Sequence, residues 1–489
     1  MSLVNGTLEL LAEPGPDWVA AVLNTPVASG ASLRTPPQSR AEVRIGSAAL
    51  QIGANAQFTV QALDDQSLVL VLQRGNIALS LRELLVGEHV EVRAADAVFT
   101  ISAPGSYRFG HAPLARRFEV RVFAGAGAFS APGASAPPSL TAGQQAQVDA
   151  RTLAVLGQGD AQLARFDEWA AQRAQRVDRV APGGFVSPEM TGADELDSHG
   201  RWRVDPRVGA VWYPNGVDAE WAPYRAGHWA WVAPWGWTWI DDAPWGFAPS
   251  HYGRWLFIAG RWGWVPGRYV ARPAFAPALV GFYGRGPTAG TPWVGWFPLA
   301  PGEAYQPGFV ASARHVERLN VGASIGVNPG GYRYAQTSFA VTAVAPEAFG
   351  TTTSAAGASR LPLSPAALSG AGVSATHGAP VPAPAAAAAA VAAGAAAIAA
   401  PSAERALAPT PSTRDTAKPD ASAREARAAR AQLRRDGTLP APAATSPARG
   451  RADQATRAGA RREPGAPAKG GNSRQCNPAG GGCKRGRVA

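Results

Sequence analysis

Short stretches of alternating apolar and polar residues dominate the first 125 residues. The alternation is clear over 41–45, 58–61, 90–93 and 118–122. A period of two directs one face of a strand into a core and the other toward solvent. Residues 67–72 are almost continuously apolar and predict a central strand. Gly-containing turns, among them Arg74-Gly75-Asn76, separate the runs. The pattern predicts a β domain over 1–125, built as a sandwich, roll or solenoid.

The next segment, 126–193, changes character and predicts a linker. Residues 126–138 are mostly Gly, Ala, Ser and Pro, which favours a loop. Over 160–179 the apolar residues fall near one face of a helix, with Arg and Glu elsewhere. We expect a connector helix there that docks through Phe166 and Trp169.

An internal repeat begins at Gly200. The tripeptides Gly200-Arg201-Trp202, Gly227-His228-Trp229 and Gly253-Arg254-Trp255 recur at nearly equal intervals, and each precedes a second tryptophan. The repeating unit predicts a β-hairpin with aromatic residues alternating along its strands. Further strands over 293–299 and 339–344 are expected to close a Trp-rich β domain spanning 194–350.

Composition separates this domain from the rest of the chain. Fourteen of the 16 tryptophans lie between Trp202 and Trp296, so this segment can build a dense core from few residues. From residue 351 the chain is rich in Ala, Pro, Ser, Gly and Arg and has few large apolar residues. Such a segment buries too little surface to offset its conformational entropy, which predicts a disordered tail over 351–489.

Charge and cysteine content also belong to the tail. It holds 19 Lys and Arg against 7 Asp and Glu, whereas the whole chain has a net charge of +11. Residues 1–350 therefore sum to −1. The chain's two cysteines, Cys476 and Cys483, can form a disulfide that closes a small Gly-rich loop. This neighbourhood has too few ligands for a metal site, and we expect neither a metal nor a cofactor.

The β domain carries a first family resemblance. The segments Leu33-Arg34-Thr35, Ser39–Gly46 and Gln73–Asn76 resemble the FecR domain. This is a β-rich module typical of exported bacterial proteins and of iron-signalling regulators. The resemblance covers residues 1–125 and implies a FecR-like β fold.

The Trp-rich segment carries a second and more distinctive resemblance. Residues 221–229, 235–239, 245–249, 251–255 and 294–299 are similar to an uncharacterised Trp-rich domain. That domain follows FecR domains in many proteobacterial envelope proteins. The two resemblances together imply a periplasmic or envelope location. No signal peptide or transmembrane segment is visible, and we expect a signal peptide to precede Met1 in the natural protein.

The candidate sites are few, and we expect no catalytic residue. His228 and His251 occupy near-equivalent repeat positions beside Asp241-Asp242. They fit either a metal or acid–base site or, more simply, hydrogen bonds within turns. No serine elbow, phosphate-binding glycine loop or zinc-spaced cluster occurs.

Exposed aromatic rings beside Arg and His would instead form a platform for sugars, peptides or cations. Most tryptophans of the segment are expected in the core. The candidate ligand-binding residues on this reading are Tyr224, His228, Trp229, Tyr252 and Trp255.

Three functions fit these patterns. The first is a non-catalytic envelope protein that binds a protein, a glycan or an anionic polymer. The second is a FecR-type sensory regulator, although the chain lacks the transmembrane segment such signalling uses. The third is a nucleic-acid-associated protein acting through its basic tail, which we do not expect if the protein is exported. The sequence does not define an oligomeric state.

Overall fold

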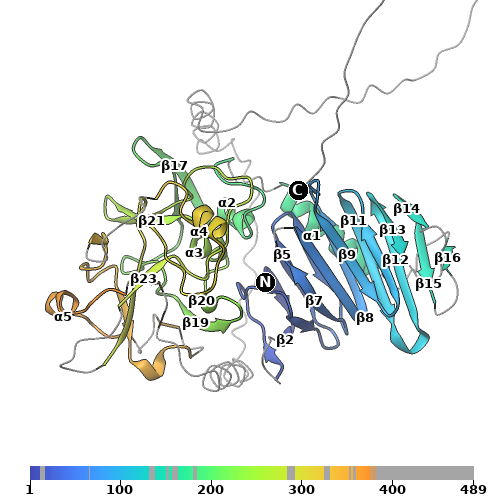
Figure 1. Cartoon of the computed structure of the whole chain (residues 1–489), viewed down its shortest axis with the longest axis horizontal. Helices are drawn as coiled ribbons and strands as arrows, with labels where there is room; N and C mark the ends of the chain where they lie inside the picture. The colour runs from blue at the N-terminus through green and yellow to red at the C-terminus, as the bar shows by residue number, and fades with distance from the viewer. Residues whose placement is uncertain are drawn as a thin grey trace, which may run out of the picture. The chain divides into compact units, whose positions relative to one another are not determined.

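The computed structural model describes most of residues 1–379 and is mainly β, as predicted (Figure 1). The described range excludes 12–16, 65, 131–137, 150–152, 157–162, 180–183, 284–291, 324–330, 352–353, 356–359, 375 and 378. The chain divides into two units, Met1–Pro440 and Ala441–Ala489. The second unit lies outside the described residues, as do Cys476 and Cys483 and most of the predicted tail.

The N-terminal β domain is a 16-stranded assembly in which nearly all pairings are antiparallel. Its strands are β1 (Leu3–Asn5), β2 (Glu9–Leu11), β3 (Val19–Ala20), β4 (Ser32–Arg34), β5 (Arg40–Ile45), β6 (Ala48–Ile52), β7 (Gln57–Leu63), β8 (Ser67–Leu81), β9 (His89–Ala94), β10 (Ala97–Ile101), β11 (Gly105–Ala112), β12 (Arg117–Ala124), β13 (Ala126–Ser130), β14 (Ser139–Thr141), β15 (Gln145–Val148) and β16 (Leu153–Leu156). A short 3-10 helix, η1 (Pro113–Ala115), joins β11 and β12.

One long strand, β8, organises this domain. Its first part pairs with β7 and, in parallel, with β9, and its second part pairs with β6 and β11. The apolar run at 67–72 is thus a central strand, as predicted. The turn expected at Gly75 is absent because the strand continues through it. Gly75 has a φ of +84°, and a Cβ there would meet Asn55 and Ala56, so glycine permits the change of partners.

The predicted linker is wrong over 126–130, 139–141, 145–148 and 153–156. These residues form β13 to β16 and extend the domain. The small residues that suggested a loop are needed for packing. Gly127 lies against Phe99, and a Cβ at position 127 would sit 2.5 Å from that ring.

The connector helix α1 (Ala164–Arg179) matches the prediction, and its side chains dock on the β domain. Phe166 lies against Gly53, and Arg40 lies over the ring of Trp169. Arg173 donates to the fully buried carboxylate of Glu42 at 2.9 Å and 3.0 Å. Burial alone would raise the pKa of Glu42, but its bonds to Arg173 and Arg44 lower it to about 2.

The Trp-rich domain contains three small sheets. Its strands are β17 (Gly200–Asp205), β18 (Gly209–Pro214), β19 (Gly227–Val232), β20 (Gly236–Asp241), β21 (Arg254–Ile258), β22 (Arg261–Val265), β23 (Val280–Phe282), β24 (Val294–Pro298) and β25 (Thr342–Val344). Its helices are η3 (Ala193–Glu195), α2 (Leu196–His199), α3 (Phe247–His251), α4 (Ala313–Leu319), η5 (Pro346–Ala348) and α5 (Pro365–Ser369). Each predicted repeat is a hairpin, and the first and third join in one sheet in the order β17-β18-β22-β21.

A close glycine–tryptophan contact recurs in all three hairpins. Gly200 packs against Trp212, Gly227 against Trp239, and Gly253 against Trp264, so closely that a Cβ at any of these glycines would overlap its ring or the facing backbone. All three tryptophans are fully buried. Their indole N–H groups donate, in the same order, to the Leu196 carbonyl (2.9 Å), the Asp241 carboxylate (3.0 Å) and the Tyr252 carbonyl (2.8 Å).

The domain does not end at Gly350 as predicted. Leu368 of α5 is fully buried in the Trp-rich core, and Val373 forms a bridge with Tyr283. His377 is 5% exposed, and its Nδ1 accepts from the Gln306 N–H at 2.8 Å. A few anchoring residues therefore hold a Pro/Ala/Ser-rich segment whose composition alone predicted disorder.

We predict that Gly200→Ala destabilises the Trp-rich domain by about 2 kcal/mol, because overpacking a filled core typically costs 1–3 kcal/mol. Gly200 has an extended φ of −163°, so the effect would come from the contact with Trp212 and not from backbone strain. Urea unfolding followed by tryptophan fluorescence measures it. The control is Gly372→Ala, where a Cβ meets nothing within 4 Å. Equal stabilities of the two variants would contradict the role of the contact.

We also predict that acid loosens the docked segment at His377. Burial lowers the pKa of His377 from 6.5 to about 4. Between pH 6.5 and pH 4 the imidazole is protonated when the segment is undocked and neutral when it is docked. The equilibrium constant for docking should therefore fall by up to about tenfold per pH unit in this range. Hydrogen exchange at the Ser374 and His377 amides, which donate to Phe282 and Gln306, reports the opening.

His377→Gln should remove this pH dependence, whereas the control His199→Gln should keep it. An identical pH profile in wild type and His377→Gln would refute the assignment.

Candidate functional site

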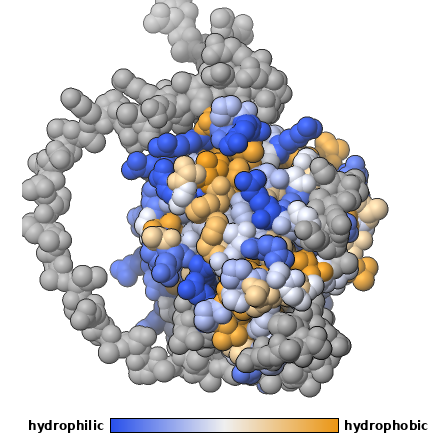
Figure 2. Space-filling model, turned by 90° about the vertical axis from the view of Figure 1, so that its left-hand side faces the viewer, coloured by the Kyte–Doolittle hydropathy of each residue, from blue (hydrophilic) through white to orange (hydrophobic). Residues whose placement is uncertain are grey.

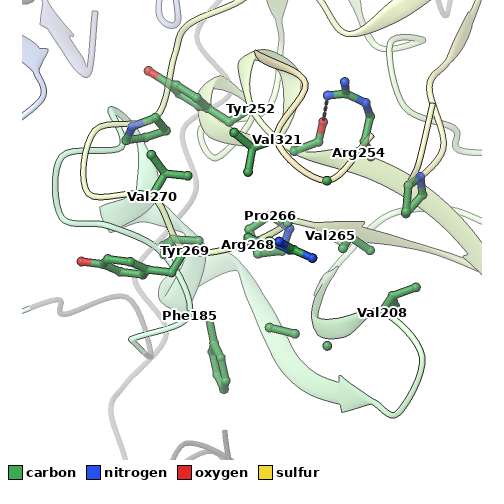
Figure 3. Close-up of a pocket in the computed structure, with 18 of the residues that line it drawn as sticks. Phe185, Val208, Tyr252, Arg254, Val265, Pro266, Arg268, Tyr269, Val270 and Val321 are labelled. Carbon is green, nitrogen blue, oxygen red and sulfur yellow. Dashed lines mark hydrogen bonds between the residues drawn. The ribbon is translucent and has the colours of Figure 1, made fainter. Parts of the chain in front are cut away.

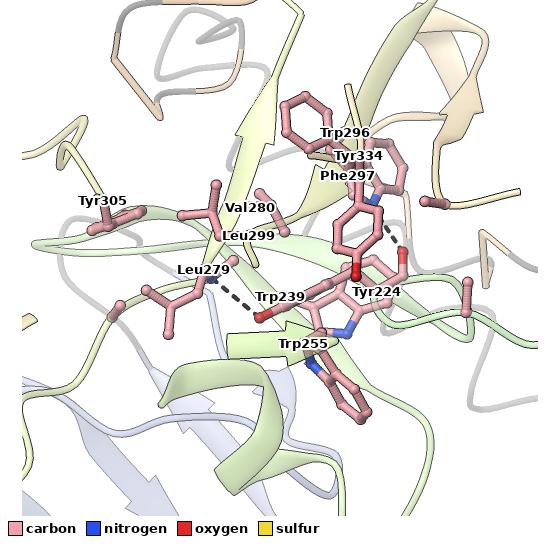
Figure 4. Close-up of a cluster of buried hydrophobic side chains, with 14 of the residues drawn as sticks. Tyr224, Trp239, Trp255, Leu279, Val280, Trp296, Phe297, Leu299, Tyr305 and Tyr334 are labelled. Carbon is pink, nitrogen blue, oxygen red and sulfur yellow. Dashed lines mark hydrogen bonds between the residues drawn. The ribbon is translucent and has the colours of Figure 1, made fainter. Parts of the chain in front are cut away.

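All four aromatic residues expected at the surface are buried core residues, and Figure 4 shows two of them, Tyr224 and Trp255. Tyr224, Trp229 and Trp255 are each 2% exposed. The Tyr224 hydroxyl donates to the Ser250 carbonyl at 2.9 Å, and the Trp255 indole donates to the Pro249 carbonyl at 3.1 Å. The polar atoms of Tyr224 and Trp255 thus serve backbone groups inside the domain, whereas the buried Trp229 indole nitrogen has no hydrogen-bond partner among the described residues. The expectation of exposed rings fails here because other aromatic rings pack on them: Trp239 on Tyr224, Trp296 on Trp229 and Trp221 on Trp255.

The histidine and aspartate candidates do not assemble into one site. His251 is fully buried, and its Nδ1 pairs with the Ala276 carbonyl at 2.8 Å. Burial lowers its pKa to about 3, which keeps the imidazole neutral. Asp241 accepts from the Trp239 indole and, within the turn that follows β20, from the Ala243 N–H. His228 is half-buried and lies across the β19–β20 hairpin from Ile240. No metal-binding group of three His, Cys, Asp or Glu occurs in the described part of the chain.

Tyr252, although only 7% exposed, is one of the residues that line a cavity in the Trp-rich domain (Figure 3). Its volume is about 920 Å³, within the range of ligand-binding clefts. Six segments form its wall: 185–190, the β17–β18 turn, residues 252–254 at the start of β21, residues 265–279 after β22, the turn after β24, and residues 318–323 at and after the end of α4. On the face of the molecule shown in Figure 2, by comparison, hydrophobic residues form small areas between hydrophilic ones.

Arginines supply most of the charge of this cavity. They are Arg207, Arg254, Arg268 and Arg318, and among the described lining residues Asp205 is the one carboxylate. Asp205 already accepts from the Arg207 N–H at 2.8 Å and lies 3.6 Å from the Arg207 guanidinium. The wall is therefore positive, although the β domain and the Trp-rich domain together are nearly neutral.

Two of the arginines differ in how they are held. Arg254 follows the repeat glycine Gly253, and its guanidinium donates to the carbonyls of Gly253, Glu303 and Leu319 at 2.8–3.3 Å. Burial lowers its pKa to about 10, so it stays charged at neutral pH. Arg268 is exposed and forms no hydrogen bond or ion pair with the residues that the structure describes.

The rest of the wall is apolar and aromatic. It includes Tyr269, the largely buried Phe185 and Tyr252, and several valines and prolines. The described lining contains no His, Cys, Lys or Glu, and the Ser187 hydroxyl donates to the Ala271 carbonyl. This arrangement can bind a ligand, and it holds no paired nucleophile and base.

Sequence reasoning missed the cavity arginines. Arg207 and Arg268 follow prolines in turns, as Asp205-Pro206-Arg207 and Pro266-Gly267-Arg268. Two Pro-containing turns that each present an arginine near a repeat strand were the available signal.

No helix among the described residues is both long enough and apolar enough to cross a bilayer.

Comparison with known proteins gives a family without a known activity. Residues 193–303 match DUF6600, a family of unknown function. This match supports the predicted uncharacterised domain over most of its length, whereas no FecR family match is found. No curated protein matches the chain.

Among solved structures, the chain is similar to two crystal structures of a protein proposed to be an anti-sigma factor from Parabacteroides distasonis ATCC 8503. Both share 12% identity and a TM-score of 0.24 with it. One match covers 28% of this chain and 64% of that one, less than two thirds of its length, and the other covers 38% and 99%. A TM-score this low does not relate the folds.

Proposed function

We propose that this protein is a non-catalytic binding protein of the bacterial envelope. In this proposal the Trp-rich domain binds a polymer or a protein partner in its cavity. The observation that carries the proposal is the cavity wall, which combines arginine donors, three aromatic rings and aliphatic side chains. Such a wall suits binding, because a few placed polar groups on an apolar surface give both affinity and orientation.

The envelope location rests on the sequence resemblances. Residues 33–46 and 73–76 resemble the FecR domain, which is typical of exported proteins. The absence of cysteine before Cys476 suits an oxidising compartment. The tail favours a second candidate, nucleic-acid binding, because residues 351–489 carry a net charge of +12.

The cavity's role is tested by photocrosslinking in cells. A photoreactive residue at Val321, which lines the cavity and is 43% exposed, should give a discrete crosslinked product. Filling the opposite wall with Val208→Trp should lower its yield roughly tenfold, a loss of about 1.4 kcal/mol. The control Val310→Trp, at a fully exposed site outside the cavity, should leave the yield unchanged.

Equal yields in Val208→Trp and Val310→Trp would show that the cavity is not the binding site. Release of soluble fragments from peptidoglycan by the wild-type protein, lost in His228→Ala or His251→Ala, would refute the non-catalytic assignment.

A further inference from the structure

The hydrogen-bond donors and acceptors on the cavity wall limit which ligands it can bind. A guanidinium only donates hydrogen bonds, and four of them line this wall. The wall's carboxylate, Asp205, accepts from the Arg207 N–H at 2.8 Å and lies 3.6 Å from the Arg207 guanidinium, and the Ser187 hydroxyl donates to the Ala271 carbonyl. The described lining contains no Asn, Gln, Thr or Glu, so its side-chain acceptors are Asp205 and the hydroxyls of Ser187, Tyr252 and Tyr269. With four guanidiniums against one carboxylate, the wall favours a ligand that is rich in acceptors, as carboxylates are.

The apolar part of the wall narrows the class further. Val208, Val265, Val270 and Val321 lie among the lining residues labelled in Figure 3, with Arg268 between them. A sugar chain would place many hydroxyl donors against this surface, and each buried donor without an acceptor costs about 1–3 kcal/mol. A peptide that alternates acidic and apolar side chains would instead match both kinds of lining.

The charges around the cavity favour such a partner. Arg268 has no ionic partner among the described residues, and the Arg207 side chain is 77% exposed with a carboxylate no nearer than 3.6 Å. Pairs this exposed and this long are weak, so both guanidiniums can be recruited by a ligand at little cost. Arg254 adds a positive charge held behind them by carbonyl groups.

From these observations, and resting on the proposed function, we propose that the cavity binds an acidic peptide segment of a partner protein. Carboxylates of this segment pair with Arg268 and Arg207, and its apolar side chains lie on the valine and aromatic wall. The basic tail is not this ligand, because its net charge has the same sign as the wall.

The experiment measures fluorescence anisotropy of a labelled acetyl-Glu-Leu-Glu-Phe-Glu-Leu peptide with the full chain. We expect Arg268→Glu to raise the Kd roughly tenfold or more, which corresponds to about 1.4 kcal/mol. The matched control is Arg314→Glu, an exposed arginine of α4 outside the cavity, which should change the Kd less than twofold. Because the tail is the same in all variants, its contribution cancels in this comparison.

Two further probes separate the ligand classes. The isosteric acetyl-Gln-Leu-Gln-Phe-Gln-Leu peptide should bind at least tenfold more weakly, and so should hexagalacturonate, an acidic glycan. Equal effects of Arg268→Glu and Arg314→Glu, or equal binding of the Gln peptide, would overturn the proposal. Tighter binding of hexagalacturonate would replace the peptide by a glycan.

The photocrosslink at Val321 keeps this inference distinct from the proposed function. A crosslink that Val208→Trp abolishes, together with no binding of the acidic peptide, would leave the binding function in place and remove the peptide. Failure of both experiments would remove both.

Discussion

The close contact between a glycine and a fully buried tryptophan is the constraint on which the Trp-rich domain depends. In each hairpin the first strand approaches the indole of the second so closely that no side chain fits between them. The indole then donates its N–H to the Leu196 or Tyr252 carbonyl outside the hairpin, or to the Asp241 carboxylate at the end of the second strand. Each contact therefore fixes both the hairpin and the segment beside it, which explains how small sheets and short helices hold one core.

The same repeat also shapes the cavity. The residue between the glycine and the first tryptophan is Arg201, His228 or Arg254, and the three have different surroundings. Arg201 is exposed, His228 is half-buried, and Arg254 is enclosed by carbonyl groups at the cavity wall. Because neighbours along a strand point to opposite faces, a buried tryptophan at one position directs the preceding residue away from that core. In the third hairpin this geometry places a cation beside an open space.

Periodicity predicted the strands well because a period of two is a local property. The runs at 41–45, 67–72 and 118–122 became β5, β8 and β12, and the three Gly-x-Trp units became hairpins. The failures were non-local. The small residues at 126–130 predicted a loop. Gly127 is in fact a strand residue, and it must be small because Phe99 packs against it. Residues 360–379 read as disordered although Leu368 and His377 are buried in the domain. Composition reports the average burial of a segment and not the contribution of one or two anchors.

The candidate site was harder to predict, because folding brings together arginines that are far apart in the sequence. Residues 1–350 sum to −1, so no total over the sequence indicates a positive surface. The acidic residues of the Trp-rich domain lie mostly elsewhere, as at Asp218 and Glu220 or at Asp242, whereas turns from separate hairpins bring Arg207 and Arg268 to one wall. A local field of this kind selects partners by the groups nearest to the ligand, since charges beyond about 10 Å are screened at 0.1 M salt. A nearly neutral folded region can therefore still present an anion-binding cavity.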